Sequence, residues 1–257
     1  MTFVILLTVF LTLFPCVSHA QNASPGAVIL ASWTPDPQIS LSLKSNPILF
    51  KEKLENSMKK LLKNPASLSV FLTPYSDKDS SEGLFQKITI NVTRGEYDNL
   101  VLERANTDFY DVQLNTTKLI NEEKIDTVRV KKIDMDILIL QNDLNAFLDA
   151  KSNSIGVRDP RIDMHPNNLV LSGSTKYGFM KVKFWATGNL KVHNAKAIWF
   201  HPKNIKLNGM PMPGAFLGTL TKRINPVLNL EKFPYQINLQ NIITGDGFLQ
   251  FTSNQTN

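Results

Sequence analysis

The sequence has very little cysteine, with one such residue among 257, at position 16. This cysteine lies in an almost wholly apolar run, Phe3 to Val17, which a Ser-His-Ala sequence follows. A short apolar run that ends in small residues predicts a signal peptide over residues 1–20, cut after Ala20. The rest of the chain then has no disulfide, no thiolate nucleophile and no cysteine metal ligand. An uncleaved anchor is the alternative, because no Lys or Arg precedes the run, but the run is shorter than the roughly 20 residues of a membrane span.

Histidine is also scarce, and the signatures of common enzymes are absent. After residue 20 the histidines are His165, His193 and His201, and none has a second histidine three to five residues away. A local zinc site is therefore not predicted. The motifs Gly-x-Gly-x-x-Gly, Gly-x-x-x-x-Gly-Lys, Gly-x-Ser-x-Gly and His-Glu-x-x-His do not occur. We expect a protein that is not an enzyme and that has no cofactor and no metal; a hydrolase whose site is dispersed in sequence is an alternative.

Two local patterns resemble reactive sites. Ser57 and Lys60 fit the Ser-x-x-Lys pattern of serine acyl-enzymes, but the companion motifs Ser-Asp-Asn and Lys-Thr-Gly are missing. Asp134 and Asp136 place two carboxylates on one face of a predicted strand, an arrangement that can bind Ca²⁺ or serve acid–base chemistry. Since lysines flank this pair, we interpret it as a solvated strand face.

The charge is moderately positive, with 28 basic and 22 acidic residues and a net charge of +6. All of these residues follow Ala20. A positive excess favours anionic surfaces such as phospholipid headgroups. No long block of basic residues occurs, so nucleic acid is not an expected partner. Hydrophobic residues make up 42% of the chain, which is enough for a sizeable core.

Proline and polar residues dominate residues 21–46, which we predict to be a linker or an N-terminal extension. The spacing then becomes that of an amphipathic helix, with Asn46 as N-cap, Pro47 as first residue and Asn64-Pro65 as the end. The apolar face of this helix contains Phe50, Leu54, Met58, Leu61 and Leu62.

Further along the chain, apolar and polar residues alternate with a period of two, which predicts antiparallel strands. The segments with this pattern are 68–72, 88–92, 100–114, 128–139, 169–175, 179–192, 196–208, 235–243 and 247–252. Short helices are predicted after Asn142 and over 214–224. Without a βαβ rhythm, this order predicts an α+β fold with helices on one face of a long antiparallel sheet. We expect one domain over 47–253 and a tail over 254–257.

Several segments resemble the bacterial LmeA-like phospholipid-binding family, and together they cover most of residues 48–252. The closing segment, 207–251, has a proline turn, a short amphipathic helix, Asn-Pro, Phe-Pro before a strand and a Gly-containing hairpin. The other segments are SLSVFLTP (67–74), GEYDNLVLERANTDFYDVQLN (95–115), ILQNDLNAFL (139–148) and NNLVLSG (167–173).

The resemblance implies a tubular-lipid-binding-like fold, in which a long curved antiparallel sheet wraps around helices and encloses an apolar groove. It implies phospholipid binding at or beyond the plasma membrane, and the family has no catalytic residues to transfer. We therefore expect an exported protein of the periplasm or the outer face of the membrane, peripheral to the membrane surface. The alternative is an assembly factor that uses the same surface to bind a membrane-protein partner of the cell envelope.

These expectations give a hypothetical site between the first helix and the sheet. The residues predicted to contact acyl chains are Phe50, Leu54, Met58, Leu61, Phe216 and Leu220. The residues predicted to meet the headgroup phosphate are Lys59, Lys60, Lys222 and Arg223. Basic residues near a helix end are also favoured by the helix dipole, which is the alternative explanation for the second group.

Overall fold

The structure is a computed structural model of the chain, and it describes residues 33–97, 99–155, 157–177, 180–195, 197–212, 228–229 and 239–253. The chain divides into two compact units. The described residues of the N-terminal unit are 33–97 and 104–136, and those of the C-terminal unit are 99–103 and the segments from 137 onward.

Two consecutive helices begin the described part of the N-terminal unit, α1 (Pro37–Ser45) and α2 (Ile48–Leu61). The Asp36 carboxylate caps α1 by accepting hydrogen bonds from the backbone N–H groups of Gln38 (2.8 Å) and Ile39 (3.3 Å). Asp36 and Pro37 thus form a helix start that the sequence analysis did not predict, and the linker or N-terminal extension over 21–46 stays a prediction. The helix predicted after Asn46 is confirmed as α2, although Asn46 ends α1 and Pro47 is the N-cap of α2.

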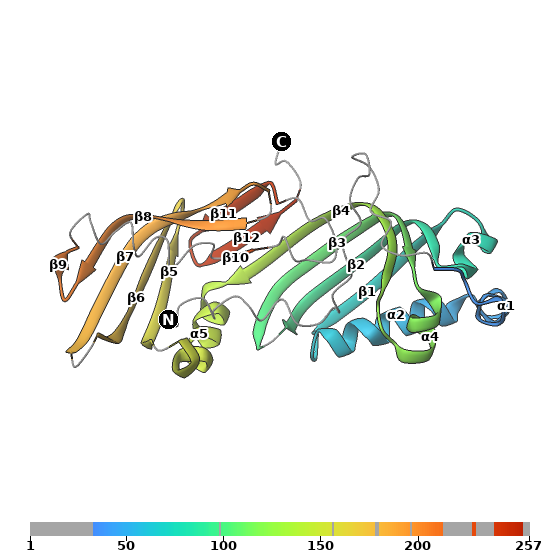
Figure 1. The fold of residues 1–257 in the computed structure, drawn as a ribbon, viewed down its shortest axis with the longest axis horizontal. Helices are drawn as coiled ribbons and strands as arrows, with labels where there is room; N and C mark the ends of the chain where they lie inside the picture. The colour runs from blue at the N-terminus through green and yellow to red at the C-terminus, as the bar shows by residue number, and fades with distance from the viewer. Residues whose placement is uncertain are drawn as a thin grey trace. The chain divides into compact units, whose positions relative to one another are not determined.

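The strands of the N-terminal unit follow one another in chain order across the sheet (Figure 1). β1 pairs antiparallel with β2, and Val70 opposes Ile90 while Leu72 opposes Ile88, so the alternating apolar residues share one face. Short helices join the strands. The elements are β1 (Ser67–Pro74), α3 (Asp77–Ser81), β2 (Leu84–Tyr97), β3 (Leu100–Leu114), α4 (Thr116–Glu122) and β4 (Thr127–Leu140), of which β3 begins and β4 ends in the C-terminal unit.

α2 contributes buried side chains to the core of the N-terminal unit. Phe50 and Leu54 are 3% and 1% exposed, and the Phe50 ring centroid lies 4.8 Å from that of Phe85 in β2. Full burial of each such side chain contributes about 1.5–3 kcal/mol, which holds the helix on the strands. Other buried members of this core are Val70, Ile88, Ile90, Val92, Val112 and Leu119.

The C-terminal unit contains a second sheet with strand order β10-β8-β7-β6-β5 (Figure 1). Its antiparallel register aligns Ile162, Leu171, Ala186 and Ile205 in one row across four strands. Leu148 of α5 packs in the same core. The elements are α5 (Gln141–Ile155), β5 (Arg158–His165), β6 (Asn168–Tyr177), β7 (Met180–His193), β8 (Ala197–Leu207), β9 (Met210–Pro211), β10 (Leu228–Asn229), β11 (Asn241–Gly245) and β12 (Phe248–Thr252).

The α+β class and the antiparallel strands are confirmed, and the helix predicted after Asn142 is α5. The strands form two sheets instead of the one long sheet that we expected. The helix predicted over 214–224 lies outside the described residues, and the single domain over 47–253 stays a prediction. Among the helices that the structure describes, none has the length and apolar character that crossing a membrane requires.

Candidate functional site

The apolar face of α2 divides into a buried part and a surface part. Phe50 and Leu54, in its first two turns, are closed into the core. Met58 and Leu61, in its last turn, are half-buried. Among the predicted acyl-contacting residues on α2, therefore, Met58 and Leu61 reach the surface, whereas an acyl chain could touch Phe50 or Leu54 only after α2 had moved away from the strands.

Lys60, one of the predicted headgroup residues on α2, already has an acidic partner. Its ammonium forms an ion pair with the Glu123 carboxylate at the end of α4, and Lys53 Nζ lies 2.9 Å from Oε1 of the same carboxylate. Hydrogen bonds from Lys60 and Lys53 lower the pKa of Glu123 to about 2. Glu123 thus links α2 to α4, and it compensates charge that we had assigned to a lipid phosphate.

Lys59 is different. It is exposed on the last turn of α2 between Met58 and Lys60, and no acidic side chain of the described ranges lies within ion-pair distance of it. The same helix turn carries the half-buried apolar side chains Met58 and Leu61. The remaining predicted site residues, Phe216, Leu220, Lys222 and Arg223, lie outside the described residues.

Polar side chains form a network across β2, β3 and β4, which we call the polar ladder. The Asp108 carboxylate accepts from Thr89 Oγ1 (2.6 Å) and pairs with Lys87 (3.0 Å), and Lys132 pairs with Asp134 (2.7 Å). The Tyr110 ring has Lys87 Nζ at 5.2 Å and Lys132 Nζ at 5.3 Å from its centroid. The members of the polar ladder are Lys87, Thr89, Asp108, Tyr110, Lys132 and Asp134.

The two carboxylates singled out in the sequence, Asp134 and Asp136, both have basic partners. Asp134 pairs with Lys132 in the polar ladder, and the Asp136 carboxylate lies 2.9 Å from Arg104 Nη2. Hydrogen bonding to Asp134 raises the pKa of Lys132. Within the described ranges, no group of three or more His, Cys, Asp or Glu side chains is arranged to hold a metal ion. Asp136 therefore forms an ion pair between β3 and β4, and Asp134 forms one within β4.

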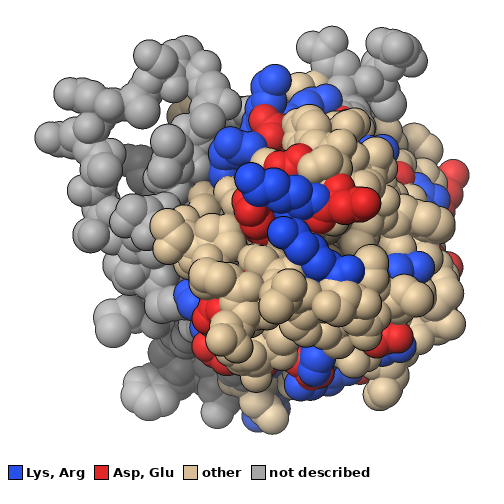
Figure 2. All heavy atoms as spheres, turned by 90° about the vertical axis from the view of Figure 1, so that its right-hand side faces the viewer, with Lys and Arg blue, Asp and Glu red and all other residues tan. Residues whose placement is uncertain are grey.

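Figure 2 faces the N-terminal unit and shows basic side chains next to acidic ones over the upper part of the view. The contacts of Asp108 with Lys87 and Thr89 were missed from the sequence, because they join two strands whose relative register is set by folding. The alternation within each strand predicted only that these side chains share a face.

The family model of the LmeA-like phospholipid-binding proteins matches residues 82–254, about two thirds of the chain. The predicted resemblance is confirmed, but the match begins at residue 82, well after the predicted start at 48. α1, α2, β1 and α3 therefore precede the matched segment. No curated protein and no solved structure matches the chain.

Proposed function

The chain belongs to the LmeA-like phospholipid-binding family, and from this premise we propose that it binds a phospholipid without catalysing a reaction on it. The family match is the observation that carries the proposal. Since α2 precedes the match, the family supports the activity and not the position of an acyl site on that helix. The position of the acyl site is argued instead from the half-buried side chains at the surface of the N-terminal unit.

We place one acyl chain beside the last turn of α2. Met58 and Leu61 are half-buried there, so an acyl chain would remove their remaining apolar surface from water. Lys59 is exposed on the same turn of α2, and its charge suits a phosphate oxygen. The half-buried side chains Phe109 and Met135 are further apolar groups of the N-terminal unit with which an acyl chain could pack.

The proposal includes a tubular-lipid-binding-like groove and export of the chain. A groove is supported by the family match, because a bound phospholipid needs a concave apolar surface for its acyl chains. Export is supported by the apolar run over residues 3–17 and by the absence of cysteine after it. The protein would then meet its lipid at the periplasmic or outer face of the membrane, as a peripheral protein.

The test is native mass spectrometry with lipid extraction on residues 21–257, exported in a bacterium and purified without detergent. We expect the wild type to retain a stoichiometric phospholipid. The double variant Met58→Asp, Leu61→Asp removes two half-buried apolar contacts, so we expect at least about tenfold weaker retention. Leu41→Asp is the matched control, because Leu41 on α1 is 66% exposed in the same unit, and it should retain lipid as the wild type does.

Equal retention by the wild type and by a folded Met58→Asp, Leu61→Asp variant would remove the acyl site from α2 while leaving phospholipid binding in place. A wild-type chain that carries no phospholipid and takes none up from vesicles would contradict the proposed function. If such a chain instead formed a stoichiometric complex with one membrane protein of the envelope, the assembly-factor alternative would replace it.

A further inference from the structure

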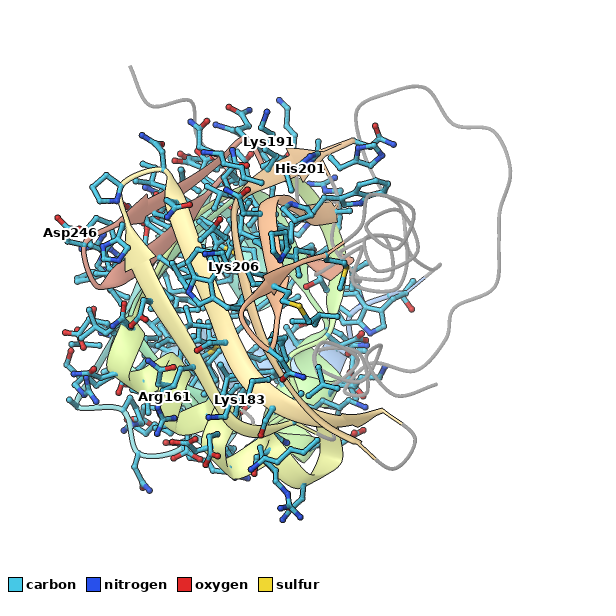
Figure 3. All side chains as sticks on the ribbon, turned by 90° about the vertical axis from the view of Figure 1, so that its left-hand side faces the viewer. Arg161, Lys183, Lys191, His201, Lys206 and Asp246 are labelled. Carbon is cyan, nitrogen blue, oxygen red and sulfur yellow. The ribbon has the colours of Figure 1, made fainter. Side chains whose placement is uncertain are left out.

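The C-terminal unit has a hollow of about 500 Å³ on its second sheet. Strands β6, β7 and β8 supply most of its lining, which includes Ser174, Lys181, Lys183, Trp185 and Lys206. Figure 3 looks at this side of the unit, with Lys206 near the middle and Lys183 below it. The hollow lies within the segment that the family model matches.

The strand register explains why these side chains meet. Trp185 of β7 lies opposite Ser172 of β6 on one side and opposite Lys206 of β8 on the other, and Lys183 lies opposite Ser174. Alternation along β7 puts residues 181, 183 and 185 on one face, and the buried Ala186 on the other. The lysines therefore lie on the face away from the core.

The charge of the hollow is positive. It contains three lysines and one carboxylate, Asp159. In the described part of the chain, no carboxylate comes within ion-pair distance of Lys181, Lys183 or Lys206. Lys206 Nζ lies 5.3 Å from the centroid of the Trp185 ring, a cation–π contact that holds the ammonium over the indole. A concave surface with uncompensated positive charge attracts anions.

Ser174 adds an independent indication of a ligand. It is 4% exposed and lines the hollow, yet its hydroxyl Oγ makes no hydrogen bond to the described residues. Buried hydroxyl groups nearly always have a partner, because leaving them unpaired is unfavourable. A ligand oxygen in the hollow would accept a hydrogen bond from this hydroxyl.

We propose that this hollow binds a phosphate group. Lys181, Lys183 and Lys206 surround its oxygens, the Ser174 hydroxyl donates a hydrogen bond, and the exposed part of the Trp185 ring packs against the carbon atoms of the ligand. Asp159 excludes a second anionic group from its side of the hollow. The phosphate belongs either to a phospholipid headgroup or to a soluble phosphate ester, and the preference for the headgroup rests on the proposed function.

The experiment measures binding of residues 21–257 to two probes: phosphatidylcholine vesicles that contain phosphatidylglycerol, and soluble glycerol 3-phosphate. The variant Lys183→Gln, Lys206→Gln removes two charges from the hollow. Lys191→Gln, Lys203→Gln is the matched control, because it removes two exposed lysines from the same strands outside the hollow. We expect the first variant to bind about tenfold or more weakly, and the control to bind nearly as the wild type does.

Ser174→Ala separates the specific site from general charge attraction. This variant keeps every charge, and we expect several-fold weaker binding to the same probe. If the wild type binds only the vesicles, and Ser174→Ala and Lys183→Gln, Lys206→Gln weaken that binding, the phosphate belongs to a lipid headgroup. If the wild type binds glycerol 3-phosphate and the same variants weaken that binding, the phosphate belongs to a soluble ester. Equal binding of the wild type, Ser174→Ala and both lysine variants would overturn the proposal, as would binding of neither probe.

The two proposals fail separately. Lipid retention by native mass spectrometry reports on the acyl site, whereas loss of vesicle or glycerol 3-phosphate binding in Lys183→Gln, Lys206→Gln reports on the hollow. A lipid-free wild type that binds glycerol 3-phosphate through the hollow would contradict the proposed function and support the phosphate site. A wild type that retains lipid, with phosphate binding unchanged in all variants, would support the proposed function and contradict the phosphate site.

Discussion

At the scale of single residues, Glu123 shows how a local conformation serves a distant contact. It ends α4 in the left-handed region, with φ 49°, and its side chain accepts hydrogen bonds from two lysines of α2. Lys53 lies 70 positions earlier in the chain. The ion pairs are partly exposed to water, so salt weakens them and their stabilisation is modest.

We expect the free energy of unfolding of Glu123→Gln to decrease less steeply than that of the wild type as the pH falls into the acid range. The pKa of Glu123 falls from 4.5 to about 2 on folding, so the folded state binds fewer protons in that interval. Its stabilisation is present above the unfolded pKa and is lost as the pH falls toward 2. The measurement is the urea midpoint between these pH values, which should fall less steeply for Glu123→Gln than for the wild type.

The neighbouring exposed residue gives the control for this change. Glu122→Gln removes the same charge without breaking the contact to α2, so its midpoint should follow the wild type across the acid range. A Glu123→Gln slope equal to the wild-type slope, at low salt, would show that the two lysines do not stabilise the folded carboxylate.

At the scale of elements, period and capping predicted the long segments. Phe50, Leu54 and Met58 recur at helical spacing and form α2, and the alternation around Ile88 and Ile90 gives β2. Such patterns are readable because one face of each element is buried over its whole length. The sequence did not predict that Phe50 and Leu54 are buried in the core, because spacing identifies an apolar face but not what covers it.

Short elements were missed where local signals are weak or conflict. β5 was not predicted, because Pro160 and the charged residues around it are unfavourable in a strand. Ile162 and Met164 nevertheless alternate there, and both are buried. α4 contains two threonines, and it is stabilised by the Asn115 cap and by Leu119, which is 0% exposed. Packing against the rest of the fold stabilises these two elements, and such packing is hard to predict from a single sequence.

Gly83 gives a prediction for the junction of α3 and β2. Its φ is 76°, and a Cβ at this position would overlap the Leu114 carbonyl oxygen and lie 2.8 Å from Thr116 Cγ2. We expect Gly83→Ala to destabilise the fold by about 2–4 kcal/mol, from the left-handed conformation and the backbone clash together. Chemical denaturation measures the change in the free energy of unfolding.

Gly247 separates these two causes. It has the same φ of 76°, but a Cβ there would have no atom within 4 Å. Gly247→Ala should therefore cost only the conformational part, about 1–2 kcal/mol. If both variants lost the same stability, the proximity of Gly83 to Leu114 would contribute nothing.

At the scale of the whole molecule, removal of residues 1–20 leaves a cysteine-free chain with the full net charge of +6. We expect a chain that is expressed with these residues in a bacterium to be recovered from the periplasm with Gln21 as its first residue. Intact-mass and N-terminal analysis measure this, and Ala20→Arg is the control, because a large charged residue at the cut site should block cleavage. A membrane-bound wild-type product that reacts with a maleimide through Cys16 would indicate a retained anchor instead.

If the N-terminal unit meets a bilayer, the polar ladder favours an orientation that keeps its face of the strands in water. Lys87 of β2 pairs with Asp108 of β3, and Lys132 pairs with Asp134 within β4. Moving this face into hydrocarbon would strip water from several charges at once, which costs several kcal/mol for each ion. The opposite face of β2 carries Ile88, Ile90 and Val92, which are already buried in the core of the unit. These three side chains would meet a lipid only if that core opened.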